Sequence, residues 1–135
     1  MTLEELRAHV MFQTNNDVDD LDEFQPAVDN YINEGYNRLV EAYAKTNLDV
    51  IDTSGTDPFP SLTSAADEPL IPSWAHRAIA DFASYMMYRN GNQYKQARGR
   101  EYLDAFNSIL FRLRFPVNGK GNHFYNLYTD RRDNG

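Results

Sequence analysis

The feature that most constrains this 135-residue chain is a long amphipathic helical pattern that begins near residue 21. Its apolar residues keep helical spacing over about six turns, as in an α-helix with one buried face. Carboxylates crowd its first turn, where they interact favourably with the positive end of the helix dipole. Such a stripe must be covered by other elements, so the pattern indicates a helical bundle. The stripe consists of Leu21, Phe24, Val28, Ile32, Leu39 and Tyr43, with Tyr31, Tyr36 and Val40 beside it.

Two residues inside this pattern limit how the helix is built. Pro26 has no backbone N–H, so the helix either starts a few residues before it or kinks there. Gly35 weakens the middle of the helix but leaves room for another backbone to come close. We therefore expect an early start or a kink at Pro26, and a close approach at Gly35.

A short helix is predicted ahead of the long one, over about residues 3–12. Thr2 and Glu5 have the spacing of a capping box, in which each satisfies a free backbone N–H of the other. The apolar residues of this segment fall on one face and are expected to be buried. They are Leu3, Leu6, Val10 and Met11.

A helical hairpin is predicted in the second half of the chain. Its first helix opens at Pro72 and ends at Asn90-Gly91, where Gly91 suits the left-handed cap conformation. Asn92 then caps the second helix, and the tight break makes the two helices antiparallel. The first stripe is Trp74, Ala75, Ala78, Ile79, Phe82, Tyr85 and Met86; the second is Tyr94, Ala97, Tyr102, Ala105, Phe106, Ile109, Leu110 and Leu113.

Two segments interrupt the helical pattern. Residues 47–72 hold four of the six prolines and form a long loop, in which residues 49–52 have the composition of a brief strand. The chain changes character again after residue 114, because Pro116 cannot continue the helix. The predicted fold is therefore all-α: a small bundle of about four helices over residues 1–114, with a long Pro-rich loop and an extended C-terminal arm over 115–135.

The arm carries a large apolar load on a glycine-flanked segment. An exposed segment of this kind favours association in water, so the arm either packs back on its own domain or inserts into a partner. Its apolar residues are Phe124, Tyr125, Leu127 and Tyr128. We expect partner docking. The residues assigned to docking are Phe115, Pro116, Asn118, Gly119, Lys120, Gly121, Asn122, His123, Phe124, Tyr125, Leu127 and Tyr128.

Charge is divided unevenly along the chain. Residues 1–70 contain 15 Asp and Glu against 3 Lys and Arg, whereas residues 71–135 contain 5 against 10. The split favours head-to-tail contact between copies, and it argues against non-specific coating of DNA. The alternative is that solvated helix faces simply differ in charge. The residues expected to meet between copies are Asp19, Asp20, Asp22 and Glu23 on one side, and Arg98 and Arg100 of the basic hairpin on the other.

No pattern in the sequence indicates catalysis or a metal site. There is no cysteine, and the three histidines lie in separate segments without metal-ligand spacing. The acidic stretch at residues 17–22 has Leu21 where a calcium loop needs an oxygen ligand. Nucleophile and phosphate-loop motifs are missing as well. We therefore expect no enzymatic activity and no cofactor, and the short apolar runs predict no membrane span.

The order of these segments is similar to that of the small head–tail connector proteins of tailed bacteriophages. The similarity rests on Thr2-Leu3-Glu4-Glu5-Leu6, Asp20-Leu21-Asp22-Glu23-Phe24, Ile71-Pro72-Ser73-Trp74-Ala75 and Phe106-Asn107-Ser108-Ile109-Leu110. The tail from Phe115 to Asn122 resembles the Gly-rich arm of the connector that stabilises packaged DNA in short-tailed phages. The 47–70 loop fits the pattern least well.

This resemblance implies a structural role at one vertex of a virion. Copies would form a ring on the portal protein after assembly in the host cytoplasm, with the C-terminal arm docked on the portal. The ring would help to retain packaged DNA, which passes through without sequence-specific binding, and would offer a platform to a downstream tail protein.

Two other functions remain open at this stage. A nucleic-acid-binding regulator or packaging factor would use the basic hairpin, where Arg89, Lys95, Arg98 and Arg100 cluster near Tyr94. A small enzyme such as a particle-borne cell-wall hydrolase is the third possibility, and no motif supports it.

Overall fold

The structure, a computed structural model, describes residues 1–16, 21–46, 59–89 and 91–115. Within these residues the fold is all-α, without a strand. Its helices are α1 (Leu3–Gln13), α2 (Leu21–Thr46), α3 (His76–Tyr88) and α4 (Gln93–Arg114), and a short 3₁₀ helix, η3 (Ser73–Ala75), leads into α3. The predicted small bundle of about four helices is confirmed.

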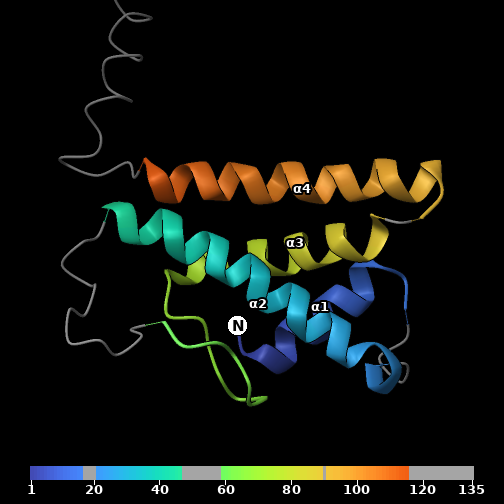
Figure 1. Ribbon diagram of the computed structural model, residues 1–135, viewed down its shortest axis with the longest axis horizontal. Coiled ribbons are helices and arrows are strands. Elements are labelled where there is room, and N and C mark those ends of the chain that lie inside the picture. Colours follow the sequence, from blue (N-terminus) through green and yellow to red (C-terminus); the bar gives the residue numbers. More distant parts are fainter. Residues whose placement is uncertain (17–20, 47–58, 90, 116–135) are drawn as a thin grey trace, which may run out of the picture.

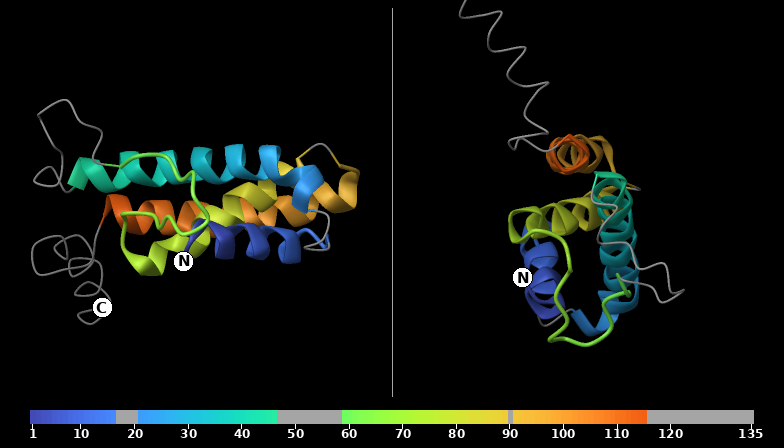
Figure 2. Two further views of the ribbon diagram at one scale, coloured as in Figure 1. Left: turned by 90° about the horizontal axis from the view of Figure 1, so that it is seen from below. Right: turned by 90° about the vertical axis from the view of Figure 1, so that its left-hand side faces the viewer.

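The helices are arranged around a central pair (Figure 1). Helices α2 and α3 both contact α1 on one side and α4 on the other. The end-on view of Figure 2 shows α4 above this pair and α1 below it, with residues 59–72 running past α1 and α2. Helices α3 and α4 run in opposite directions, so the predicted antiparallel hairpin is also correct.

Helix α1 follows its sequence signals closely. Both halves of the Thr2–Glu5 capping box are formed, and Asn15, just past the helix, adopts a left-handed conformation with φ of 59°. All four residues predicted for its apolar face are fully buried. This match is expected where a helix is amphipathic and its ends are defined by side-chain caps.

Helix α2 accommodates both of its unusual residues. It begins at Leu21, so Pro26 lies in the second turn of a helix that is assigned without interruption to Thr46. Gly35 is buried against α3, where an added Cβ would lie 3.0 Å from the Cβ of Phe82. The ring of Phe82 in turn packs on Phe106 of α4, with centroids 4.9 Å apart. Gly35 therefore lets α2 and α3 approach at the centre of the core.

The start of the hairpin differs from the prediction. Pro72 is not the first residue of α3; its backbone is extended, with ψ of 139°, and η3 comes between it and α3. Trp74 was assigned to the buried stripe but is 47% exposed, while Ala75 is buried. A 3₁₀ turn advances about 120° per residue rather than 100°, so the α-helical spacing extrapolated back from α3 fails at Trp74.

The seam of α4, the strip of residues that packs on α2 and α3, is narrower than predicted. Its fully buried residues are Gly99, Phe106 and Leu113, which recur every seven positions. Tyr102, Ile109 and Leu110 are half-buried as part of this seam, whereas Tyr94, Ala97 and Ala105 are exposed, contrary to the prediction. The reason is that α4 covers only the groove between α2 and α3, and a helix resting on one groove buries a strip with a spacing near seven residues.

The break between α3 and α4 is also made differently. Asn92 caps α4 as predicted, accepting a hydrogen bond from the Lys95 backbone N–H at 3.0 Å. Gly91, however, does not adopt the left-handed conformation; an added Cβ there would lie 2.6 Å from the Cβ of Lys95. Glycine is therefore favoured at this position by crowding against the first turn of α4.

Helix α4 ends at Arg114, and Phe115 caps it. The predicted strand at 49–52 and the arm beyond Phe115 lie outside the described residues. No helix in the described part of the chain combines the length and the apolar character needed to cross a bilayer.

Candidate functional site

The candidate site is an exposed aromatic surface at one end of the bundle. Trp74, Phe111 and Phe115 are 47%, 55% and 49% exposed, respectively. Phe111 and Phe115 pack together with ring centroids 4.9 Å apart, and the Arg112 guanidinium lies 4.5 Å from the centroid of the Trp74 ring. Trp74, Phe111, Arg112 and Phe115, here called the aromatic end, thus bring η3 and the last turn of α4 together.

Of the residues predicted to form the arm, the structure describes only Phe115. The aromatic end therefore includes the first residue of the predicted arm. The remaining arm residues, from Pro116 to Tyr128, lie outside the described residues. Sequence reasoning missed Trp74 and Phe111, because both fit a helical stripe or a solvated face equally well.

The basic hairpin lies at the opposite end of α4. Lys95, Arg100 and Tyr94 are exposed, and Tyr94 reaches 71% exposure. Arg98 differs, because it is half-buried with its Nε buried and without a hydrogen-bond partner, and the nearby hydroxyl groups of Tyr102 and then Tyr94 raise its pKa. The two arginines assigned to contacts between copies are therefore not equivalent, since only Arg100 projects freely into solvent.

The acidic residues assigned to the same contacts are only partly described. Glu23 is exposed in the first turn of α2, Asp22 belongs to this turn with its side chain outside the description, and Asp19 and Asp20 lie outside the described residues. Helices α2 and α4 both begin at the same end of the bundle (Figure 1). Glu23 lies in the first turn of α2 and Arg100 in the second turn of α4, so both belong to the halves of these helices nearer that end.

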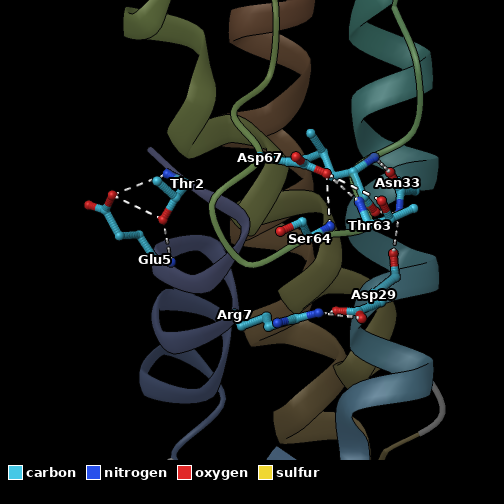
Figure 3. A network of polar contacts seen from close by, with 9 residues as sticks. Thr2, Glu5, Arg7, Asp29, Asn33, Thr63, Ser64 and Asp67 are labelled. Carbon is cyan, nitrogen blue, oxygen red and sulfur yellow. Dashed lines mark hydrogen bonds and ion pairs between the residues drawn. The ribbon is translucent and has the colours of Figure 1, made fainter.

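A polar network ties residues 59–72 to the bundle (Figure 3). The Asp67 carboxylate accepts hydrogen bonds from the backbone N–H groups of Ser64 and Thr63 at 2.8 and 2.9 Å, and these bonds lower its pKa. The backbone carbonyls of Asp67 and Ala65 accept from the N–H groups of Leu3 and Glu4, at 2.8 and 3.1 Å. The segment thus caps free N–H groups of α1 that have no partner within the helix.

Two further contacts complete this network. The Asn33 side chain pairs with the Leu62 backbone, accepting from its N–H at 2.8 Å and donating to its carbonyl at 3.0 Å. Arg7 donates two hydrogen bonds of 2.8 Å to Asp29, joining α1 to α2. These polar groups form a structural clip, and their hydrogen-bonding capacity is used to hold α1, α2 and the loop together.

A second polar group is buried between α1 and α3. Gln13 donates from Nε2 to Asp81 at 2.9 Å and accepts at Oε1 from the Ser84 hydroxyl at 2.6 Å. The Gln13 backbone carbonyl also accepts from the hydroxyl groups of Tyr88 and Tyr102, at 3.1 and 3.2 Å. Gln13 therefore connects α1 with both helices of the hairpin, a role that no spacing in the sequence indicated.

Titratable groups near Gln13 do not form a catalytic arrangement. Burial raises the pKa of Asp81 and lowers that of His9, whose Nε2 is buried without a hydrogen-bond partner. Ser84 is fully buried and its hydroxyl is directed to Gln13 rather than to a histidine, so no activated nucleophile is assembled there.

The described part of the chain also brings together no group of three or more potential metal ligands. His76 instead lies 2.8 Å from the N-terminal nitrogen of Met1 and 2.9 Å from the carbonyl oxygen of Ile71. His76 thus serves the contact between the chain start and η3, while His123 lies outside the described residues.

Comparison with known proteins adds no relative. No family model matches the chain, and no curated protein or solved structure matches it. Function must therefore be inferred from the surfaces described above.

Proposed function

We propose that this chain is a structural head–tail connector subunit of a tailed bacteriophage. Copies form a ring on the portal protein at the portal vertex, help to retain packaged DNA, and provide the platform to which a downstream tail protein attaches. The observation that carries the proposal is the aromatic end, an exposed apolar surface that includes Phe115, the first residue of the predicted arm.

The aromatic end has the character of a protein-binding surface. Aromatic residues and arginine are enriched where protein interfaces are fully buried, because they supply large contact area with few rotamers to fix. Trp74, Phe111 and Phe115 contribute such rings, and Arg112 covers one face of Trp74. In the connector, this surface lies against the portal and the arm extends the contact from Phe115 onward.

The charge distribution supports a ring of side-by-side copies. Rotation about a ring axis does not change the position of a residue along that axis. Two groups that meet between neighbouring copies must therefore lie at similar positions along the bundle axis, when the bundle axis is parallel to the ring axis. Glu23 and Arg100 are assigned to this contact because they lie in the first two turns of helices that begin at the same end of the bundle. Opposite charges at one height favour correct lateral pairing between copies.

Imaging by cryo-electron microscopy of the protein mixed with its portal tests the ring directly. The expected result is helical density below the portal, with residues 115–128 in contact with it. Portal particles without added density, while the protein remains free or bound to DNA, would contradict the connector.

Two variants test which surface docks. Deletion of residues 116–135 is expected to leave the helical circular dichroism intact and to abolish attachment to the portal. The double substitution Phe111→Ser and Phe115→Ser should weaken attachment without unfolding, because both side chains are exposed. Tyr94→Ser, at the exposed opposite end of α4, is the matched control. Normal attachment of the deletion variant would show that the arm assignment is wrong.

Charge reversal tests the contact between copies. Glu23→Arg or Arg100→Glu alone should prevent ring formation on the portal, and the two together should restore part of it. Asp104→Arg, an exposed acidic position near the middle of α4, is the control. Equal behaviour of the three single variants would exclude this pairing.

The second candidate function is a nucleic-acid-binding regulator or packaging factor. It is favoured by the exposure of Tyr94, Lys95 and Arg100 on one end of α4, since aromatic and basic groups together bind single-stranded nucleic acid. A gel-shift titration at low salt decides it. Lack of DNA affinity in the full-length protein would eliminate it, whereas affinity reduced by Arg98→Ala and Arg100→Ala would support it.

A further inference from the structure

A hollow between α3 and α4 is separate from the aromatic end and from both polar networks. It lies at the hairpin end, where Tyr85 and Arg89 of the α3 side face Gln96, Gly99 and Arg100 of α4. Its volume is about 190 Å³. This is room for a small oxyanion with some of its water, because one water occupies about 30 Å³ in the liquid.

Gly99 creates the hollow by bringing the two helices close and adding no side chain. A Cβ at this position would lie 3.1 Å from the Cβ of Tyr88 and 3.6 Å from the backbone oxygen of Tyr85. Gly99 is buried although the residues on either side of it on α4 are not. Gly99 thus contributes only backbone to the lining, and the remaining lining residues are Tyr85, Arg89, Gln96 and Arg100.

The lining is positively charged and contains no carboxylate. Arg89 follows the end of α3 and Arg100 lies on the second turn of α4, and both are exposed. Neither has an ion-pair partner among the residues that the structure describes. The Gln96 side chain donates a hydrogen bond of 2.9 Å from its Nε2 to the Gly91 carbonyl, and this bond fixes the orientation of its amide group. The two guanidinium groups are therefore available to an anion.

We propose that this hollow is a binding site for a phosphate group, held by Arg89 and Arg100. Guanidinium groups present planar pairs of N–H donors that match phosphate oxygens, and two of them on separate helices can contact one anion from different sides. The phosphate can come from inorganic phosphate in solution or from the backbone of DNA. The site shares Arg100 with the contact proposed between copies, but it does not depend on the aromatic end or on binding to the portal.

The first experiment uses inorganic phosphate as the probe. The full-length, isotopically labelled protein is titrated with phosphate and, at matched ionic strength, with chloride, while backbone amide shifts are followed by NMR. Saturable shifts at Tyr85, Gln96 and Gly99 are expected with phosphate only. Shifts that do not saturate, or that chloride reproduces, would overturn the proposal.

The second experiment removes the two arginines. Arg89→Ala with Arg100→Ala is expected to weaken phosphate binding about tenfold or more, because it removes the charge-assisted hydrogen bonds that the two guanidinium groups would donate to the anion. Arg77→Ala with Arg114→Ala, at two exposed positions at the other end of the hairpin, makes the same change in charge and should leave binding unchanged. Phosphate binding that survives the first double substitution, or falls equally in both, would overturn the site.

A third measurement identifies the source of the phosphate. Fluorescence anisotropy with a short DNA duplex is recorded for the wild-type protein and both double variants over a range of salt. DNA binding that is lost with Arg89 and Arg100 assigns the site to the nucleic-acid backbone, with a smaller salt slope in the variant. Absence of DNA binding, with phosphate binding retained, assigns it to a free phosphate. DNA binding that is independent of this pair, without saturable phosphate binding, would overturn the proposal.

Discussion

Helices α3 and α4 form one hairpin, yet they are buried to very different degrees. Ten of the 13 residues of α3 are buried, but only three of the 22 residues of α4. Helix α3 is surrounded by α1, α2 and α4, whereas α4 lies on the groove formed by α2 and α3. The comparison shows how one chain can separate its tasks: α3 holds the bundle together, and α4 offers most of its surface to partners.

The same difference appears in how polar groups are used. Asp81 and Ser84 of α3 are committed to Gln13 inside the bundle. On α4, Arg100 and Arg114 face solvent without an ion pair to any described residue. Uncommitted charge on an exposed helix is typical of an interaction surface, and it is the basis of both the contact between copies and the phosphate site proposed here.

The largest expected effect comes from the seam that attaches α4. Phe106→Ala removes a buried ring packed on Phe82 and should lower the free energy of unfolding by about 3–5 kcal/mol. Phe111→Ala, on the exposed side of the same helix, should change it by less than about 0.5 kcal/mol. Urea denaturation followed by circular dichroism measures both. Similar losses for the two variants would mean that α4 does not have one buried and one free side.

The next largest effect tests the close approach within the central pair. Gly35→Leu forces a side chain into the contact with Phe82 and should destabilise the fold by about 1–3 kcal/mol. Ala97→Leu adds the same side chain to the exposed face of α4 and is expected to be nearly neutral. Thermal unfolding compares them. A tolerated leucine at position 35 would contradict the tight contact between α2 and α3.

A smaller effect distinguishes the inner and outer ion pairs. The side chains of Arg7 and Asp29 are 11% and 26% exposed and form a bidentate pair, whereas those of Arg38 and Glu34 are 57% and 43% exposed. A double-mutant cycle with Arg7→Met and Asp29→Leu should give a coupling energy of about 1–2 kcal/mol. The cycle for Arg38 and Glu34 should give about 0.3–0.5 kcal/mol. Equal coupling energies in the two cycles would show that the Arg7–Asp29 pair is no stronger than the exposed Arg38–Glu34 pair.

The smallest effect concerns pH. Burial raises the pKa of Asp81 above its unfolded value of about 3.9, so the folded state binds the proton more tightly. The contribution of this group to the free energy of unfolding is therefore fully present below the unfolded pKa. It is lost as the pH rises through the folded pKa. Asp81→Asn keeps an acceptor for Gln13 and should remove this fall.

The measurement is the thermal midpoint of the two proteins from acidic to neutral pH. The midpoint of the variant relative to wild type should increase with pH across this range. Asp104→Asn, an exposed position on α4, is the control and should show no such trend. A difference between Asp81→Asn and wild type that stays constant with pH would show that burial of Asp81 does not act through its charge.

Local signals in the sequence were sufficient for much of the fold. The capping box at Thr2, the cap at Asn92 and the apolar spacing of α1 and α2 depend on residues within a few positions of each other. Such features act through the helix itself, so they can be identified without knowing what the helix contacts. The all-α class and the antiparallel hairpin follow from them.

Less of the candidate site than of the fold could be predicted from the sequence. Trp74 and Tyr94 were expected to be buried and are exposed, because the 3₁₀ turn and the narrow seam depend on which helices are neighbours. Gln13 gave no signal at all, since its partners Asp81, Ser84, Tyr88 and Tyr102 lie far along the chain. The function predicted from resemblance remains a proposal.

The sequence by itself determined which segments form helices, which of them are amphipathic, and how charge is divided between the two halves of the chain. Tertiary structure alone decided which apolar residues are left outside, and so placed Trp74 beside Arg112 and opened a hollow at Gly99. The physical reason is that helix formation depends on near neighbours and periodicity, whereas exposure depends on how many helices surround a given face.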